Sequence, residues 1–143
     1  MGRWIPWRIA MVAATVLGMA GAASGEPLEG LRWQKRLLLV FTQGDTERER
    51  RQRDALPDEG LRERDMLLIR VPQDGEVSVP GVGAVPSADI RSAYGVADAA
   101  SFTVILVGKD GGIKRRSSEP IAARDLFGTV DAMPMRRQET RGN

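Results

Sequence analysis

The sequence predicts an α/β domain with one mixed central sheet, and three apolar segments carry that prediction. Residues 37–42, 66–71 and 102–107 are almost continuously apolar and rich in Leu, Ile and Val, which is typical of strands buried on both faces. A cationic segment follows the third after Asp110-Gly111, a strong hairpin-turn signal. Helical patterns separate the other strands, so the predicted order is βαβαββα. Right-handed crossovers then place helices on both faces of a sheet of four strands, or five if residues 76–79 join it.

The first 25 residues have the features of a secretory signal. Arg3 and Arg8 precede a segment of mainly Ala, Gly, Val and Met, and Ala20-Gly-Ala22 fits the small-residue cleavage pattern. We expect cleavage near Ala22 to Gly25, and therefore a periplasmic or secreted protein with no membrane association after cleavage. The alternative is an uncleaved anchor, but the segment falls short of the roughly 20 strongly apolar residues that span a bilayer.

Two absences in the composition exclude several classes of site. The chain has no Cys and no His, which excludes disulfides, thiolate nucleophiles, Cys- or His-ligated metals and Ser-His-Asp chemistry. Without Arg3 and Arg8, 19 basic residues face 19 acidic ones, so the balance after cleavage is near zero and gives no reason to expect nucleic-acid binding. No sequence motif predicts a cofactor or a metal.

The first strand and the first helix follow the lead-in at residues 26–36. Trp33 stands just before the apolar run, where an aromatic side chain is more often packed than stacked on a ligand. Thr46-Glu-Arg-Glu49 fits a capping box, and we expect a helix from Thr46 to about residue 56. Glu47 with Arg51, and Glu49 with Arg53, have the spacing of helical ion pairs. These pairs favour a solvated helix over an anion-binding Arg run.

The middle of the chain is expected to alternate loops with short regular elements. Pro57-Asp-Glu-Gly60 is predicted to be a loop before the second strand, and the Gly- and Pro-rich segment 72–86 a long loop with a short edge pairing at 76–79. Ser87 begins a predicted helix that runs to about Tyr94 and ends at Gly95.

The last third supplies the hairpin and a closing helix. Residues 102–107 and 113–117 are the two strands of the hairpin. Pro120 is expected to open the closing helix and Pro134 to end it. Its apolar residues recur at helical spacing and predict a core-facing stripe: Ala123, Leu126, Phe127, Val130 and Met133. The predicted domain spans residues 26–135, and residues 136–143 are expected to be a basic, flexible tail.

Four segments resemble one bacterial family, the domain of unknown function 4174. They are residues 31–41, Arg64-Asp65, residues 108–114 and Asp131-Ala-Met-Pro-Met-Arg-Arg-Gln-Glu139. The resemblance covers nearly all of the chain after the signal and implies an exported, thioredoxin-like domain with no established activity. In thioredoxin-like proteins a redox Cys pair follows the first central strand. Here that location is residues 43–49, which contain no Cys, and Ser101 stands where a cis-proline usually precedes the third strand.

The best candidate site is a small basic surface that would bind an anion such as a carboxylate or phosphate. Five cations form it: Lys109, Lys114, Arg116, Arg136 and Arg137. The amides at the start of the Thr46 helix could add to it. The alternative, which we favour, is that these charges protect a sheet edge from aggregation. Arg64 and Asp65 are expected to form a structural pair that anchors the second strand.

Two functional hypotheses remain open. The first is a non-catalytic binding or interaction module for a protein partner or a small anion, because the fold alone confers no chemistry. The second is a Cys-free enzyme that acts on a small anionic ligand through Lys, Arg and carboxylates. The first predicts that Lys114, Arg116 and Arg64 lie scattered and solvated. The second predicts that they converge with a carboxylate in one pocket.

Overall fold

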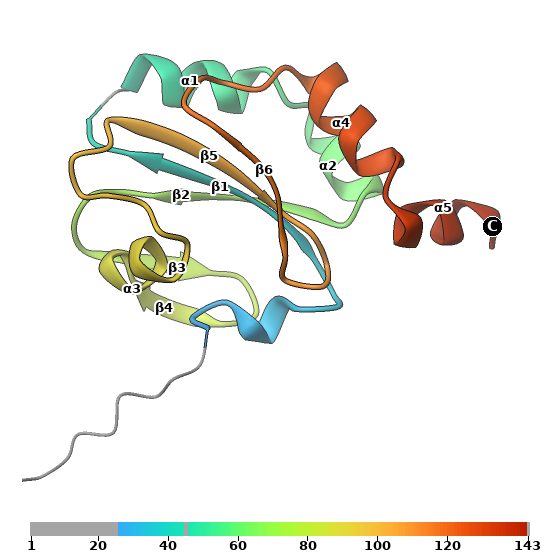
Figure 1. Ribbon diagram of the computed structural model, residues 1–143, viewed down its shortest axis with the longest axis horizontal. Coiled ribbons are helices and arrows are strands. Elements are labelled where there is room, and N and C mark those ends of the chain that lie inside the picture. The colour runs from blue at the N-terminus through green and yellow to red at the C-terminus, as the bar shows by residue number, and fades with distance from the viewer. Residues whose placement is uncertain (1–25, 45, 143) are drawn as a thin grey trace, which may run out of the picture.

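A four-stranded mixed sheet forms the centre of the protein. The computed structural model describes residues 26–44 and 46–142, so the predicted signal lies outside the described residues. The strands are β1 (Arg36–Thr42), β2 (Met66–Val71), β5 (Phe102–Val107) and β6 (Ile113–Ser117), in the spatial order β2-β1-β5-β6. β1 runs parallel to β2 and antiparallel to β5, and β6 is antiparallel to β5. The three apolar segments are therefore neighbours, as the sequence predicted (Figure 1).

Successive side chains of β1 and β5 point to opposite faces of the sheet, and both faces are buried. Leu37, Leu39 and Phe41 pack on one side and Leu38 and Val40 on the other. A strand can be apolar throughout only when both of its faces are covered, so the continuous apolar runs are explained by this two-sided burial.

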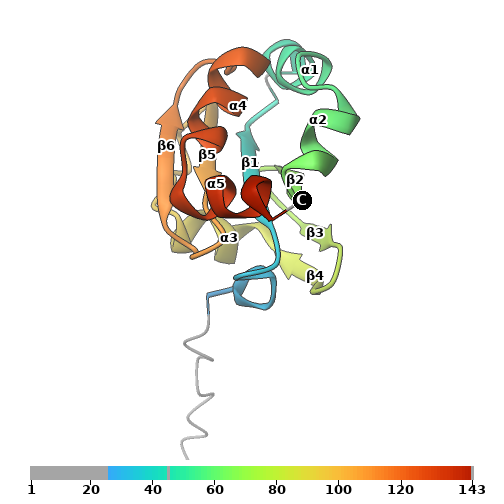
Figure 2. The same ribbon diagram turned by 90° about the vertical axis from the view of Figure 1, so that its right-hand side faces the viewer.

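Helices cover both faces, which confirms the predicted α/β architecture. One face carries α1 (Thr46–Asp54), α2 (Asp58–Glu63) and α4 (Ala123–Asp131). The opposite face carries α3 (Ser87–Ala93), a hairpin of β3 (Glu76–Val79) and β4 (Gly83–Pro86), and a short 3₁₀ turn at Glu29–Leu31. Figures 1 and 2 show the sheet between these two layers.

The segment predicted as a long loop with an edge pairing is a separate two-stranded sheet. β3 and β4 pair with each other and not with the central sheet, so the central sheet has four strands. Val77, Val79 and Val85 pack into the core. Gly81 has a φ of +81°, which a residue with a side chain rarely adopts, and this allows the tight connection between the two strands.

A helix replaces the loop predicted at Pro57–Gly60. Pro57 stands immediately before α2, and Asp58 and Glu59 occupy its first turn, where acidic side chains are favourable near the positive end of the helix dipole. Leu61 is buried against α4 and its neighbours. Pro, Asp and Gly were interpreted as turn residues, but in this order they also suit a helix start.

The closing helix is divided into two. α4 ends at Asp131, and α5 runs from Pro134 to Arg141. Pro134 therefore starts a helix instead of ending one, because the first helical position needs no amide hydrogen. The flexible tail predicted from residue 136 is helical at least to Arg141. The predicted stripe is correct: Leu126 and Val130 are fully buried, and the other three positions pack against them.

Helix α1 is held by charge pairs and by one buried amide. Glu47 accepts hydrogen bonds from Arg50 and Arg51, while Glu49 pairs with Arg70 of β2 and not with Arg53. Gln52 is fully buried and exchanges two hydrogen bonds with the backbone before α4. Within the part of the chain that the structure describes, no helix has both the length and the apolar composition needed to cross a bilayer.

Candidate functional site at the amino end of β1

Several charged segments that are distant in sequence meet where β1 begins. β1 is parallel to β2 and antiparallel to β5, so the start of β1 lies beside the start of β2 and the end of β5. The turn between β5 and β6 and the α4–α5 junction lie at the same end. The amino-end site, as we name this region, comprises seven residues: Trp33, Arg36, Asp65, Lys109, Met133, Met135 and Glu139.

Trp33 is not packed as the sequence suggested but is 62% exposed. Its backbone is left-handed, with a φ of +67°, and its N–H donates to the carbonyl of Lys109 at 2.6 Å. A left-handed conformation costs a residue with a side chain about 1–2 kcal/mol, and for a bulky residue it is a genuine outlier. Among the described residues, Asp65 is the only other non-glycine residue with a positive φ. Both lie in this site, and such strain is often concentrated at functional sites.

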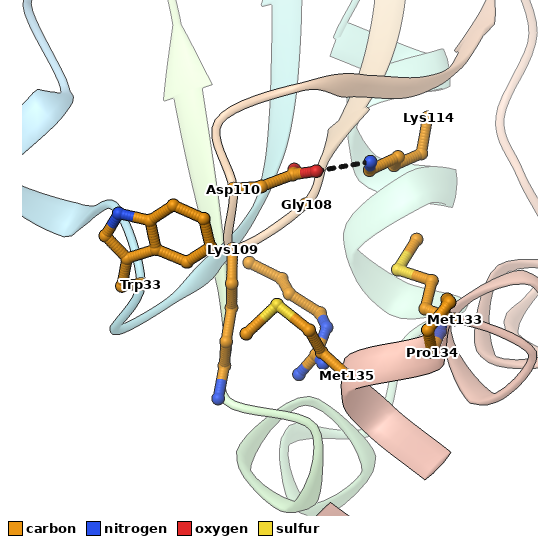
Figure 3. Close-up of a pocket in the computed structure, with 9 residues that line it drawn as sticks. Trp33, Gly108, Lys109, Asp110, Lys114, Met133, Pro134 and Met135 are labelled. Atoms are coloured by element: carbon orange, nitrogen blue, oxygen red, sulfur yellow. Dashed lines mark hydrogen bonds and ion pairs between the residues drawn. The ribbon is translucent and has the colours of Figure 1, made fainter. Parts of the chain in front are cut away.

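A pocket of about 400 Å³ opens beside Trp33. Figure 3 shows Trp33 on one side, Met133 and Pro134 on the other, and Lys109 and Met135 between them. Arg36, Lys114 and Asp110 complete the charged part of the lining, and Asp110 is paired with Lys114. The pocket therefore combines an apolar wall with cations, a combination that suits a ligand with an apolar body and a negative group.

The cations of the pocket are held by a buried charge cluster. Lys109 donates to Asp65 at 2.8 Å and to Glu139 at 2.7 Å. Arg36 donates from both terminal nitrogens to the two carboxylate oxygens of Glu139, at 3.3 and 3.2 Å, and also to the carbonyl of Arg64 at 2.8 Å. The Arg36 and Lys109 side chains are only 1% and 9% exposed.

A second set of charges extends the cluster along α4 and α5. Arg64 donates to both carboxylate oxygens of Asp131, at 2.9 and 2.8 Å, and its guanidinium lies 4.2 Å from the centre of the Phe127 ring. Arg136 lies 3.5 Å from Asp131 and 3.6 Å from Glu139. These contacts join the start of β2 to both C-terminal helices.

The cluster shifts the pKa values of its members toward their charged forms. Burial acts to raise the pKa of Glu139, but hydrogen bonds from Lys109 and Arg36 outweigh it and hold that pKa below its usual range. Burial acts to lower the pKa of Lys109, and its bonds to Asp65 and Glu139 reverse the direction. The hydrogen bond from Lys109 lowers the pKa of Asp65, and the one from Arg64 lowers the pKa of Asp131. All four groups are therefore ionised near neutral pH.

The five cations predicted to form one basic surface are distributed over four places. Lys109 and Arg136 meet in the cluster, where both already face carboxylates. Lys114 pairs with Asp110 at 2.8 Å at the pocket rim, and Arg116 donates to the carbonyl of Tyr94. Arg137 is exposed on α5. The start of α1 adjoins the opposite end of β1, so its amides do not join this set.

Arg64 and Asp65 are anchors, but they do not pair with each other. The Arg64 guanidinium bonds to Asp131, whereas the Asp65 carboxylate faces Lys109 and, at 3.8 Å, Lys35. The left-handed backbone of Asp65 turns the two adjacent side chains toward different partners.

Sequence reasoning did not identify three central residues of the site: Arg36, Glu139 and the exposed Trp33. Arg36 borders an apolar run and was not singled out, and Glu139 lies in the predicted tail. The available signal was the family resemblance, because the segments that carry it contain all three residues. Within the residues that the structure describes, no group of His, Cys, Asp and Glu has the arrangement of a metal site.

Comparisons with known proteins identify a family and a fold. The sequence model of the family described as "Domain of unknown function (DUF4174)" matches residues 27–139. Among solved structures, the chain is similar to Plasmodium yoelii Prx1a, described as modified at the N-terminus and forming an artifactual octamer. The identity is 17%, the TM-score is 0.51, and the match covers 81% of this chain and 82% of that chain. Prx1a is a peroxiredoxin, so the similarity shows a thioredoxin-like fold. No curated protein matches the sequence significantly.

Proposed function

We propose that this chain, which belongs to the DUF4174 family, is an exported, non-redox binding module. Its ligand would have an apolar body and a carboxylate. One observation carries the proposal: a strained, exposed Trp33 stands at the mouth of an apolar pocket whose charged lining includes the buried Arg36 and Lys109. An aromatic side chain supplies contact area at low entropic cost. The Arg36 and Lys109 donors in the lining supply specificity for a carboxylate.

The absence of Cys and His supports binding over catalysis. The enzyme hypothesis required Lys114, Arg116 and Arg64 to converge with a carboxylate in one pocket. Their partners are instead Asp110, the Tyr94 carbonyl and Asp131, respectively. Lys109 is the one cation of the predicted surface that lies both in the pocket and in the cluster. Its ammonium is kept charged by two carboxylates, which suits an electrostatic role and does not suit proton abstraction.

Tryptophan fluorescence tests this proposal directly. The full chain contains Trp4, Trp7 and Trp33, so a variant with Trp4→Phe and Trp7→Phe reports on Trp33 alone. We expect phenylacetate, a probe with a ring and a carboxylate, to change the emission saturably. The neutral phenylacetamide should bind at least about tenfold more weakly, a difference of about 1.4 kcal/mol. No saturable change, or equal binding of the two probes, would refute the proposal.

Export is the second part of the proposal and has its own test. It is supported by the two arginines, the apolar segment and the small-residue site at Ala20-Gly-Ala22. Mass spectrometry of the protein recovered from the cell envelope should give a mature chain that begins between Ala23 and Glu26. A chain that still begins at Met1 would contradict this part and leave the binding test unaffected.

A further inference from the structure

We infer that Glu139 is an internal ligand: its carboxylate occupies the site formed by Arg36 and Lys109, and an external carboxylate binds by displacing it. The inference rests on the proposed function and deepens it, because it identifies the group that controls access to the site. Glu139 belongs to α5, whereas the two cations belong to β1 and to the β5–β6 turn.

The contacts of Glu139 are those of a recognised carboxylate. Both of its oxygens accept from the two terminal nitrogens of Arg36, at 3.3 and 3.2 Å. Lys109 adds a bond of 2.7 Å, and Arg136 lies 3.6 Å away. A two-pronged Arg–carboxylate contact gives both strength and directional specificity, so the arrangement selects a carboxylate over a neutral group.

The cation site does not depend on Glu139 for its position. Arg36 also donates to the Arg64 carbonyl at 2.8 Å, and Lys109 also donates to Asp65 at 2.8 Å. The buried Nε of Arg36 has no hydrogen-bond partner among the described residues. Bonds at the end of the sheet therefore hold both side chains in place without Glu139. If Glu139 left, the two cations would keep their positions, and their buried N–H donors would lack an acceptor.

The helix that delivers Glu139 is weakly attached. α5 spans eight residues and contains no buried residue, and a helix of this length is not stable alone in water. Apart from its covalent link to α4, its attachment to the domain includes the charge pairs of Glu139 and Arg136. The Glu139 side chain is 27% exposed, so solvent partly screens its ion pairs, and a competing carboxylate that takes over the same donors loses little free energy in the exchange.

The position of the cations makes competition unavoidable. Arg36 and Lys109 line the pocket beside Trp33, while Glu139 lines a neighbouring hollow together with Asp65 and Arg136. Arg36 and Lys109 therefore line the pocket and at the same time bond to Glu139 in the neighbouring hollow. A second carboxylate beside Glu139 would share its donors and repel it, because like charges at close range are unfavourable.

The test compares phenylacetate binding in three proteins that all carry Trp4→Phe and Trp7→Phe. They are the otherwise unchanged chain, Glu139→Gln, and the control Glu119→Gln, whose carboxylate pairs with Arg48 away from the site. We expect Glu139→Gln to bind at least about tenfold more tightly, equivalent to about 1.4 kcal/mol, and the control to bind as the unchanged chain does. Equal or weaker binding by Glu139→Gln would overturn the inference while the proposed function stands. No binding in any of the three would refute both.

Hydrogen exchange provides a second readout that needs no substitution at Glu139. In the unchanged chain, saturating phenylacetate should accelerate amide exchange in residues 136–141, because α5 is released, and leave β1 protected. Unchanged or slower exchange in α5 together with normal binding would mean that the ligand does not displace Glu139, and the inference would fall.

Discussion

The two ends of β1 each contain a buried arginine, and they stabilise it in different ways. At the amino end, Arg36 is 1% exposed and faces the carboxylate of Glu139. At the carboxyl end, Arg91 is 2% exposed and donates to two backbone carbonyls, those of Thr42 at 3.0 Å and Pro72 at 3.3 Å. Within residues 26–44 and 46–142, Arg91 has no carboxylate partner. The arginine at the amino end is therefore part of a network of ionisable groups, whereas the arginine at the carboxyl end is bound by backbone carbonyl dipoles.

The contrast separates the location of the proposed site from the location that thioredoxin-like proteins use for redox chemistry. In thioredoxin-like proteins the redox Cys pair follows the first central strand, which here is the carboxyl end of β1. That end has Gln43 and Gly44 after the strand and no Cys. Two non-glycine residues with a positive φ, an exposed aromatic side chain and the lowered pKa values of Asp65, Asp131 and Glu139 occur at the opposite end. We therefore expect the amino end to be the part of the protein that responds to ligand and pH.

The largest expected difference between the two ends comes from removing each arginine. Arg36→Met removes the two-pronged donor of Glu139 and a donor to the Arg64 carbonyl, and should lower the free energy of unfolding by about 3 kcal/mol at pH 7. Arg91→Met loses two bonds to neutral carbonyls and should cost about 2 kcal/mol. Urea denaturation at pH 7 and pH 3 measures both. The loss of unfolding free energy caused by Arg36→Met should be smaller at pH 3 than at pH 7. An equal reduction of the loss caused by Arg91→Met would contradict the proposed difference between the two ends.

The pH dependence of stability should arise mainly at the amino end. Asp65, Asp131 and Glu139 have lowered pKa values in the folded state. Their stabilisation is complete above their unfolded pKa of about 4 and is lost as pH falls through the lower folded values. Lys109 has a raised pKa, so its contribution is complete below about pH 10.4 and is lost as pH rises through the folded value.

Denaturation midpoints measured from pH 2 to pH 11 should therefore form a plateau that declines at both limits. Glu47 of α1 also has a lowered pKa, but it is exposed and its ion pairs are screened by solvent. Glu47→Gln is accordingly a matched control that should leave the acid limb intact, whereas Glu139→Gln should flatten part of it. If Glu139→Gln left the decline in stability at low pH unchanged, the assignment of that decline to the amino end would be contradicted.

Close packing behind the site predicts a smaller effect at Gly60. A Cβ at this position would lie 2.7 Å from the ring of Phe127, which carries the Arg64 guanidinium on its face. Gly60→Ala should therefore cost about 2 kcal/mol through overpacking. Gly128→Ala in α4 is the matched control, because its Cβ would have no neighbour within 4 Å. It should stabilise the protein by about 0.7 kcal/mol through helix propensity. Thermal denaturation measures both, and a neutral Gly60→Ala would show that the contact is loose.

A small stability effect is expected at Trp33, and whether the substitution stabilises or destabilises the protein is the informative result. Asn tolerates the left-handed backbone better than Trp does, and Trp33 has little buried surface to lose. Trp33→Asn should raise the free energy of unfolding by about 1 kcal/mol while it weakens the binding of phenylacetate, followed by calorimetry. A destabilised variant would show that Trp33 is a packing residue, as its position before the strand first suggested.

The sequence was informative where local pattern and environment agree. β1, β2 and β5 were predicted because a continuous run of branched apolar residues has few alternatives, and the Asp110-Gly111 turn placed β6. α2 and α5 were missed because Pro57 and Pro134 were interpreted as breaks, although Pro is favourable beside or at the first position of a helix.

The site was only half predictable because its contacts are distant in sequence. Lys109 and Arg136 were identified as cations, but Lys109 meets Glu139 across 30 residues and Arg36 meets Glu139 across 103. No local pattern encodes such pairings. The conformation of Trp33 likewise depends on a hydrogen bond to the Lys109 carbonyl, which exists only after the β5–β6 turn has reached the start of β1.

Amide chemical-shift mapping with phenylacetate tests the central claim that the responsive site lies at the amino end of β1. In ¹H–¹⁵N spectra of the full chain, we predict progressive shifts of Trp33, Lys109 and Met135, with the amides of Gln43, Gly44 and Arg91 unchanged. Shifts confined to the carboxyl end, at Gln43, Gly44 and Arg91, would contradict the account.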